Sequence, residues 1–140
     1  MGRVGRTQEA IEHYEQALRI KPEDADLHYT IANTLQQAGK VLDAIGHYEQ
    51  ALRIKPDFAE AHNNLGSILL GLGRVPEAIG HYEQALRINP DYATAHYNLG
   101  TALEETSRMQ EAIGHYERAL QLKPDFTEAQ NRLARLRAVQ

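Results

Sequence analysis

"AIGHYEQALRI" occupies residues 44–54, and the same eleven residues return at 78–88. Near copies are "AIEHYEQALRI", which begins at Ala10, and "AIGHYERALQL", which begins at Ala112, so the four copies start at residues 10, 44, 78 and 112 and recur every 34 residues. A fixed period of this length is typical of repeat architectures, in which one supersecondary unit is duplicated and packed against its neighbour. The sequence therefore predicts a stack of repeats rather than one irregular core.

Each period is predicted to be a pair of amphipathic helices, which we call helix A and helix B. In residues 59–92, apolar side chains recur at helical spacing from Ala61 to Leu72 and again from Ala78 to Ile88. The segment between them contains Gly73, which suits a helix end, and Pro76, which suits a first helical turn. A proline then closes every helix B, because it disfavours helical geometry in the residue before it. These prolines are Pro22, Pro56, Pro90 and Pro124.

The period divides the chain into three full repeats flanked by two half repeats in a single domain, residues 1–140. The full repeats are 25–58, 59–92 and 93–126. Residues 1–24 supply a lone helix B, expected at 8–20, and residues 127–140 supply a lone helix A, expected at 127–138.

The residue pattern of the repeats resembles that of the tetratricopeptide repeat (TPR) family over essentially the whole chain. Shared features are the pair Leu65-Gly66 in helix A, a turn glycine, and alanine, tyrosine and alanine along helix B. The helix B residues in question are Ala44, Tyr48 and Ala51, Ala78, Tyr82 and Ala85, and Ala112, Tyr116 and Ala119. Departures from the family pattern are Ile31-Ala32 in place of Leu-Gly, Ser107 in place of the turn glycine, and three helix A histidines in place of a larger aromatic residue. The resemblance implies an all-α, right-handed solenoid of antiparallel helix pairs.

Two packing expectations follow from the repeat. The small alanines let neighbouring helices approach closely, while the tyrosines, Tyr82 among them, fill the space between them. Gly46, Gly80 and Gly114 lie inside helix B, where glycine is unfavourable, and the first copy has Glu12 at that place. A position that accepts both residues is expected to face outward.

Composition excludes several classes of function. A net charge of −4 gives no electrostatic basis for binding nucleic acid or an anionic membrane. The chain has no cysteine, no apolar stretch of signal-peptide length and no apolar run long enough to span a bilayer. The compartment stays open, with the cytoplasm as our expectation.

The chain is predicted not to be an enzyme, and we expect no catalytic residue, cofactor or metal. Only Ser67 and Ser107 could be serine nucleophiles, and neither lies in a strand-to-helix elbow. Seven histidines form two columns, one early in helix A and one in helix B. Equivalent residues of successive repeats lie too far apart to share one zinc ion. We expect the helix A column to be buried and the helix B column to lie on solvated surface. Pairing between the two columns is the alternative that the sequence leaves open.

The resemblance implies a non-catalytic scaffold that binds extended peptide segments of a protein partner in a concave groove lined by helix A. The residues expected there are Tyr29, Asn33, Asn63, Asn64, Ser67, Tyr97, Asn98, Thr101, Asn131 and Arg135. Asn64 and Asn98 also match an asparagine ladder that binds peptide backbone in the superhelical arm of peptide O-GlcNAc transferases, whose repeats look similar. The competing interpretation is that Asn64 and Asn98 form hydrogen bonds with the helix backbone or with neighbouring side chains, and not with a ligand. The clamp for a terminal carboxylate found in other family members is not expected, because Tyr29, Tyr97 and Thr101 replace its basic residues.

The alternative function is a structural scaffold that assembles with itself and has no ligand of its own. The two half repeats are complementary, so the last helix of one molecule could complete the first repeat of the next. The residues expected to mediate this weak head-to-tail contact are Ala10, Ile11, Tyr14, Leu133 and Leu136.

Overall fold

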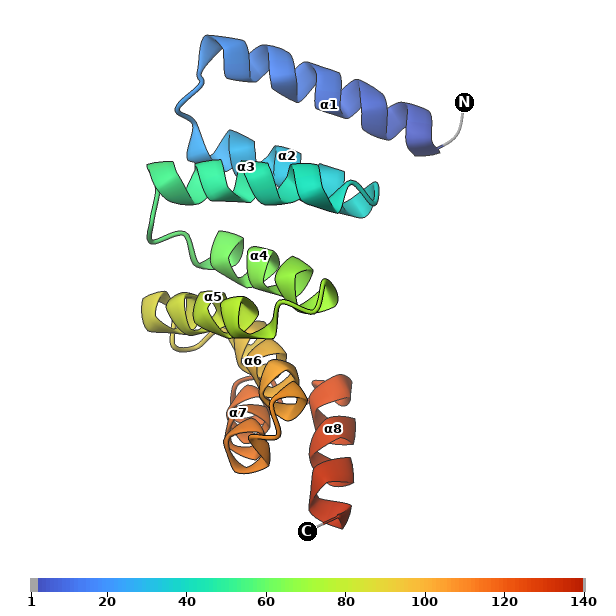
Figure 1. The fold of residues 1–140 in the computed structure, drawn as a ribbon, viewed down its shortest axis with the longest axis vertical. Coiled ribbons are helices and arrows are strands. Elements are labelled where there is room, and N and C mark those ends of the chain that lie inside the picture. Colours follow the sequence, from blue (N-terminus) through green and yellow to red (C-terminus); the bar gives the residue numbers. More distant parts are fainter. Residues whose placement is uncertain (1–2, 140) are drawn as a thin grey trace. The chain divides into compact units, whose positions relative to one another are not determined.

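A computed structural model describes residues 3–139, and these residues form eight α-helices and no strand (Figure 1). The helices are α1 (Arg3–Ile20), α2 (Ala25–Gln37), α3 (Val41–Ile54), α4 (Ala59–Gly71), α5 (Val75–Ile88), α6 (Ala93–Glu105), α7 (Met109–Leu122) and α8 (Thr127–Ala138). The helix A and helix B segments thus alternate as the sequence predicts. The first helix begins at Arg3, earlier than the expected start at residue 8.

Short turns separate the helices. Asp24 caps α2 by accepting a hydrogen bond of 3.1 Å from the backbone N–H of Leu27. The turns that lead into α3 and α5 contain Gly39 and Gly73 with φ of 80° and 81°, a left-handed conformation that glycine adopts without steric cost. Ser107 adopts the same conformation, with φ of 61°, in the turn before α7. The third repeat therefore keeps the turn although it lacks the glycine.

The chain separates into two compact units, residues 1–64 and 65–140, and the boundary falls within α4. In the first unit, α2 packs against both α1 and α3. In the second, α6 packs between α5 and α7, and α8 packs on α7.

The repeated string contributes buried residues to the core of both units, as expected. Ala44, Tyr48 and Ala51 of α3 are fully buried in the first unit. In the second, Tyr82 is 1% exposed, and its ring packs against Gly66, where a Cβ atom would lie 2.8 Å from Cε1 of the ring. The small residue in helix A thus makes room for the large one in helix B, which confirms the predicted burial of Tyr82.

Gly46, Gly80 and Gly114 are exposed, and a Cβ atom at any of them would meet no heavy atom within 4 Å other than its chain neighbours and the backbone of its own helix. The expectation that these glycines face outward is confirmed. Neither packing nor backbone conformation requires glycine at these positions.

The residues expected to mediate self-association are largely covered within the chain. Ile11 is 4% exposed on α1, which packs on α2, and Leu133 and Leu136 are 5% and 6% exposed on α8, which packs on α7. Ala10 and Tyr14 are half-buried. These three side chains are covered because each terminal helix packs its apolar stripe on the neighbouring helix, while the weak head-to-tail contact itself stays a prediction.

Candidate functional site

The polar centre of the first unit is the hydroxyl of the buried Tyr48. This hydroxyl reaches two helix A side chains of α2, hydrogen bonding to Oδ1 of Asn33 and lying 2.9 Å from Oε1 of Gln36. Oδ1 of Asn33 also accepts a hydrogen bond of 3.0 Å from Nδ2 of Asn64, and the same amide donates at 3.2 Å to Oη of Tyr29. Tyr48, Asn33 and Asn64 therefore form a connected set that spans three successive helices.

The second unit repeats this arrangement with different chemistry. The hydroxyl of Tyr82 donates to Oγ of Ser67 at 3.1 Å, and Nδ2 of Asn98 lies 3.4 Å from the same oxygen. The sequence separations, 15 from acceptor to tyrosine and 31 from acceptor to asparagine, match those of Asn33, Tyr48 and Asn64. One geometry thus recurs with a hydroxyl in place of an amide oxygen.

In the last repeat the tyrosine hydroxyl bonds to a carboxylate, which stands twelve residues before the tyrosine, as Gln36 does before Tyr48. The hydroxyl of Tyr116 donates to Glu104, whose side chain is only 13% exposed. Nη1 of Arg132 and Nη2 of Arg135, both on α8, each lie 3.3 Å from an oxygen of Glu104. Two guanidinium groups thus balance the charge of the half-buried carboxylate.

Burial raises the pKa of all three tyrosines above the ordinary value of 10.0. For Tyr116, the hydrogen bond to Glu104 and the negative charge of that carboxylate add to the effect of burial. The phenols therefore remain protonated at physiological pH, and each keeps the hydrogen that it donates to its helix A acceptor.

Two half-exposed tyrosines flank this polar set, one in each unit. Tyr29 packs on Phe58 with a centroid separation of 4.7 Å, and Tyr97 packs on Phe126 at 5.0 Å. These contacts hold one face of each ring in place. Oη of Tyr29 accepts from Asn64, so its own hydrogen remains for another acceptor.

The structure separates the predicted site residues into accessible and inaccessible ones. Asn63 is 4% exposed, so its side chain is not presented to a ligand. The hydroxyl of Thr101 donates to the backbone oxygen of Asn98 at 2.7 Å. Asn131 and Arg135 are exposed. The other predicted residues are half-buried: Tyr29, Asn33, Asn64, Ser67, Tyr97 and Asn98.

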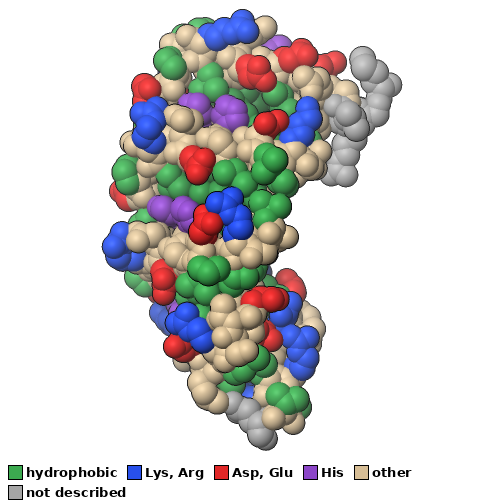
Figure 2. All heavy atoms as spheres, in the orientation of Figure 1, with side chains coloured by type: hydrophobic (Ala, Val, Ile, Leu, Met, Phe, Trp, Pro, Cys, Tyr) green, Lys and Arg blue, Asp and Glu red, His purple; other side chains and the backbone are tan. Residues whose placement is uncertain are grey.

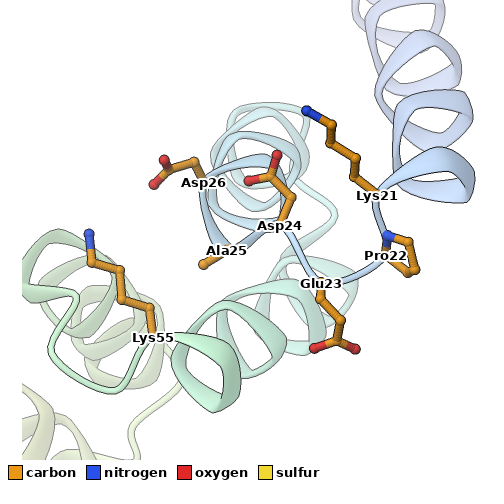
Figure 3. A pocket seen from close by; sticks show the side chains of 7 residues that line it. All are labelled: Lys21, Pro22, Glu23, Asp24, Ala25, Asp26 and Lys55. Atoms are coloured by element: carbon orange, nitrogen blue, oxygen red, sulfur yellow. The ribbon is translucent and has the colours of Figure 1, made fainter.

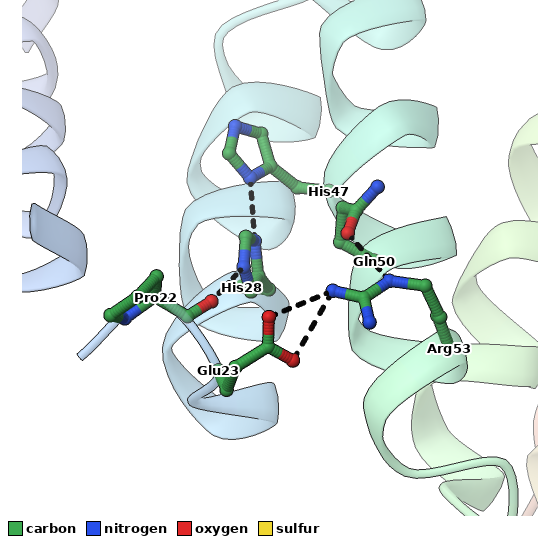
Figure 4. Close-up of polar contacts among 6 residues, drawn as sticks. All are labelled: Pro22, Glu23, His28, His47, Gln50 and Arg53. Carbon is green, nitrogen blue, oxygen red and sulfur yellow. Dashed lines mark hydrogen bonds and ion pairs between the residues drawn. The ribbon is translucent and has the colours of Figure 1, made fainter.

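The histidines pair across the two columns. Nδ1 of His28 on α2 lies 3.1 Å from Nδ1 of His47 on α3 (Figure 4), and Nδ1 of His96 on α6 lies 3.0 Å from Nδ1 of His115 on α7. The helix A column is buried, as expected, with His28, His62 and His96 between 8% and 9% exposed. The expectation that the helix B column is solvated was wrong for His47, His81 and His115, which are half-buried, whereas His13 is exposed. His47 and His115 turn toward their helix A partners.

Burial lowers the pKa of His47, His96 and His115 below the ordinary value of 6.5. The neighbouring histidine lowers the pKa of His47 and His115 further, while nearby acidic groups oppose the shift in part. Those acidic groups are Glu15 and Asp43 for His47, and Glu111 for His115. For His96, the hydrogen bond to the Pro90 carbonyl opposes the effect of burial.

A surface hollow of about 460 Å³ lies at the turn between α1 and α2 (Figure 3). Side chains of opposite charge surround it, including Lys21, Asp26 and Lys55, while Asp24 is committed to capping α2. Over the face drawn in Figure 2, basic and acidic side chains are likewise interspersed. Neither view presents the single-sign surface that phosphate-rich ligands require.

The described residues also bear on metal binding and on membrane insertion. Within residues 3–139, no group of three or more histidine, cysteine, aspartate or glutamate side chains is placed to hold a metal ion. None of the helices described is both long enough and apolar enough to cross a bilayer.

Comparisons with known proteins agree on the family. A tetratricopeptide repeat model matches residues 57–125, and a TPR repeat model matches residues 4–39 and 37–73. No curated protein sequence matches the chain.

Several solved structures are similar to the chain over most of its length. The crystal structure of MamA is 26% identical with a TM-score of 0.88, covering 94% of this chain and 77% of that one. The first TPR of Spaghetti (RPAP3), bound to the HSP90 peptide SRMEEVD, is 26% identical with a TM-score of 0.80, covering 82% and 91%. YrrB, described as a TPR protein with an unusual peptide-binding site, is 24% identical with a TM-score of 0.80, covering 91% and 66%, a likeness of fold alone. The chain belongs to the tetratricopeptide repeat family and has the all-α fold of TPR solenoids.

Proposed function

We propose that the chain is a non-catalytic protein-interaction scaffold that binds extended peptide segments along the helix A faces of its repeats. The observation that carries this proposal is the recurring polar set in which a buried tyrosine hydroxyl fixes a half-exposed helix A side chain. Side chains held in this way lose little conformational entropy when a ligand binds.

The chemistry of the set suits a peptide backbone. Nδ2 of Asn64 donates to Asn33 and Tyr29, and its Oδ1 accepts from Nδ2 of Asn63 at 3.5 Å. A second lone pair of this oxygen can accept from a peptide N–H. The hydroxyl of Tyr29 can donate its own hydrogen to a peptide carbonyl. Tyr29 and Tyr97 add rigid, amphipathic contact area at low entropic cost.

The similarity to the first TPR of Spaghetti, solved with an HSP90 peptide, supports a peptide ligand. The side chains of this chain argue for a different mode of recognition. Half-exposed Tyr29, Tyr97 and Thr101 stand where the carboxylate clamp has basic residues, and Arg132 and Arg135 already bind Glu104. We therefore expect contacts to the peptide backbone to dominate in the first unit.

A selection of extended peptides from a display library on the full chain tests the proposal. Selected peptides should bind the Asn64→Ala, Asn98→Ala double variant more weakly by about 1–3 kcal/mol, roughly 5- to 150-fold in Kd, because two backbone contacts are lost. The matched control is Glu49→Ala with Glu83→Ala, which changes two exposed helix B side chains and should leave Kd unchanged. Circular dichroism checks that both variants keep the helicity of the parent. Equal affinity of the parent and the asparagine variant, or the absence of any selected peptide, would refute this function.

A further inference from the structure

The pair of His28 with His47 and the pair of His96 with His115 share one hydrogen-bond arrangement. Nε2 of His28 lies 3.1 Å from the carbonyl oxygen of Pro22, and Nε2 of His96 lies 2.9 Å from that of Pro90. A carbonyl oxygen can only accept, so each of these Nε2 atoms carries the hydrogen and donates it. In the neutral ring, Nδ1 then carries a lone pair and no hydrogen, and Nδ1 of the partner histidine lies 3.1 or 3.0 Å away.

This arrangement matches what metal-binding histidines require. A ligating imidazole commonly donates its second N–H to a backbone carbonyl, which fixes the tautomer and orients the ring. Two nitrogens at about 2.0–2.1 Å from one ion lie about 2.9 Å apart at a right angle and about 3.3 Å apart at a tetrahedral angle. The observed separations of 3.1 and 3.0 Å fall between these values.

We propose that each pair, His28 with His47 and His96 with His115, binds one divalent transition-metal ion through its two Nδ1 atoms, with water in the remaining positions. Imidazole ligands favour Ni²⁺, Cu²⁺ and Zn²⁺. The ion replaces the hydrogen shared between the two rings, and the hydrogen on Nδ1 of His47 or His115 moves to Nε2 of the same ring. A site with two protein ligands agrees with the absence of larger ligand clusters in the part of the chain described.

At least one histidine of each pair lines an open hollow with room for water ligands. His96 and His115 both line a hollow of about 510 Å³ together with Glu111 and Gly114. His47 lines a hollow of about 570 Å³ together with acidic Glu15 and Asp43 and with Gly46. The helix B glycine next to each histidine adds no side chain that would close the opening.

The two sites should differ in affinity because of one residue. Arg118 lines the hollow beside His96 and His115, and its positive charge opposes a bound cation, although Asp91 at 3.0 Å balances it in part. The residue at the equivalent place beside His47 is the uncharged Gln50. The pair of His28 with His47 is therefore the tighter site.

Titration of the tag-free full chain with Ni²⁺, followed by calorimetry at pH 7.5, tests the proposal. His47→Gln should weaken the tighter site and His115→Gln the weaker one, each by at least about tenfold, since even the loss of an outer partner of a metal ligand costs that much. Arg118→Gln, which copies Gln50, should strengthen the weaker site. His13→Gln is the matched control, because His13 occupies the equivalent place on α1 and is exposed, and it should change neither site.

The unaltered chain provides a second measurement that does not depend on the folding of variants. Paramagnetic Ni²⁺ should broaden the imidazole signals of His28 and His47 at lower concentration than those of His96 and His115. Broadening that is strongest at His13, or binding that is unchanged by both His47→Gln and His115→Gln, would overturn the proposal and leave the pairs as structural hydrogen bonds. Peptide affinity measured in parallel reports separately on the helix A surface.

Discussion

A Cβ atom at Gly100 would lie 2.6 Å from Cε1 of the buried Tyr116, so these two residues occupy complementary space between α6 and α7. Gly100→Ala should destabilise the chain by about 1–3 kcal/mol, because the buried ring has to shift and this outweighs the higher helix propensity of alanine. Urea unfolding followed by circular dichroism measures the change. A neutral Gly100→Ala would show that the ring has room to move.

Gly114, which is exposed on α7, provides a control for the buried Gly100. A Cβ atom there meets no heavy atom within 4 Å, so Gly114→Ala should be neutral or stabilising by up to about 1 kcal/mol. The same unfolding experiment applies. We expect Gly100→Ala to lower the free energy of unfolding and Gly114→Ala to leave it unchanged or raise it. A loss of stability in Gly114→Ala would contradict the outward placement of the helix B glycines.

Tyr82 combines packing with a hydrogen bond, and the two contributions can be separated. Tyr82→Phe removes only the 3.1 Å bond to Ser67 and should cost about 0.5–1.5 kcal/mol. Tyr82→Ala also empties the space against Gly66 and should cost about 3–5 kcal/mol. Thermal melts of the two variants give the comparison, and a similar cost for both would mean that the ring is not tightly packed.

Ser107 occupies a left-handed turn position with φ of 61°, where the other two turns have glycine. Ser107→Gly should stabilise the chain by about 1 kcal/mol, since the steric cost of the Cβ atom is removed. Gly73→Ala, at φ of 81° with open space around it, is the converse and should destabilise by a similar amount. Chemical unfolding of both variants measures the two changes in the free energy of unfolding. A Ser107→Gly variant that is less stable than the parent would contradict this explanation.

The depressed pKa values of His47, His96 and His115 make stability depend on pH. In the folded state these rings resist protonation, so the unfolded chain binds more protons as the pH falls through the ordinary value of 6.5. Stability is therefore full above that value and decreases toward pH 5. The groups that face the three rings are His28, Glu15 and Asp43 for His47, Arg118 and Asp91 for His96, and His96 and Glu111 for His115.

Substitution separates the histidine contribution from that of the carboxylates. The double variant His47→Gln, His115→Gln should show a flatter loss of stability between pH 7 and pH 5, measured by urea unfolding at each pH in metal-free buffer. Parallel profiles for the parent and the variant would assign the pH dependence to other groups.

The fold was predictable from the sequence because each local signal agrees with the repeat. Prolines such as Pro56, the turn glycines and the alanine spacing of helix B all indicate the same helix pair, and the observed helices follow it. The start of α1 at Arg3 was missed, since residues 3–7 carry no apolar period.

The site was predictable only in part, because helical spacing gives the face of a residue but not its rotamer or its partner. Asn33 and Asn64 were predicted together, and they do form one set with Tyr48. Asn63 shares the sequence position of Tyr29 and Tyr97 yet is buried, which a column of equivalent positions does not reveal. The pairing of His28 with His47 was left open for the same reason, since a ring can turn toward solvent or toward its neighbour without any change in sequence.

The tyrosine hydroxyl of helix B finds an amide oxygen at Asn33, a hydroxyl at Ser67 and a carboxylate at Glu104. One buried anchor thus tolerates three chemical classes of partner on the accessible face. A lineage built on such repeats can change what its surface recognises by single substitutions at two acceptor positions, 15 and 12 residues before the tyrosine, while the column of tyrosines that carries its stability stays untouched. Selection for new ligands and selection for folding then act on different residues of the same repeat.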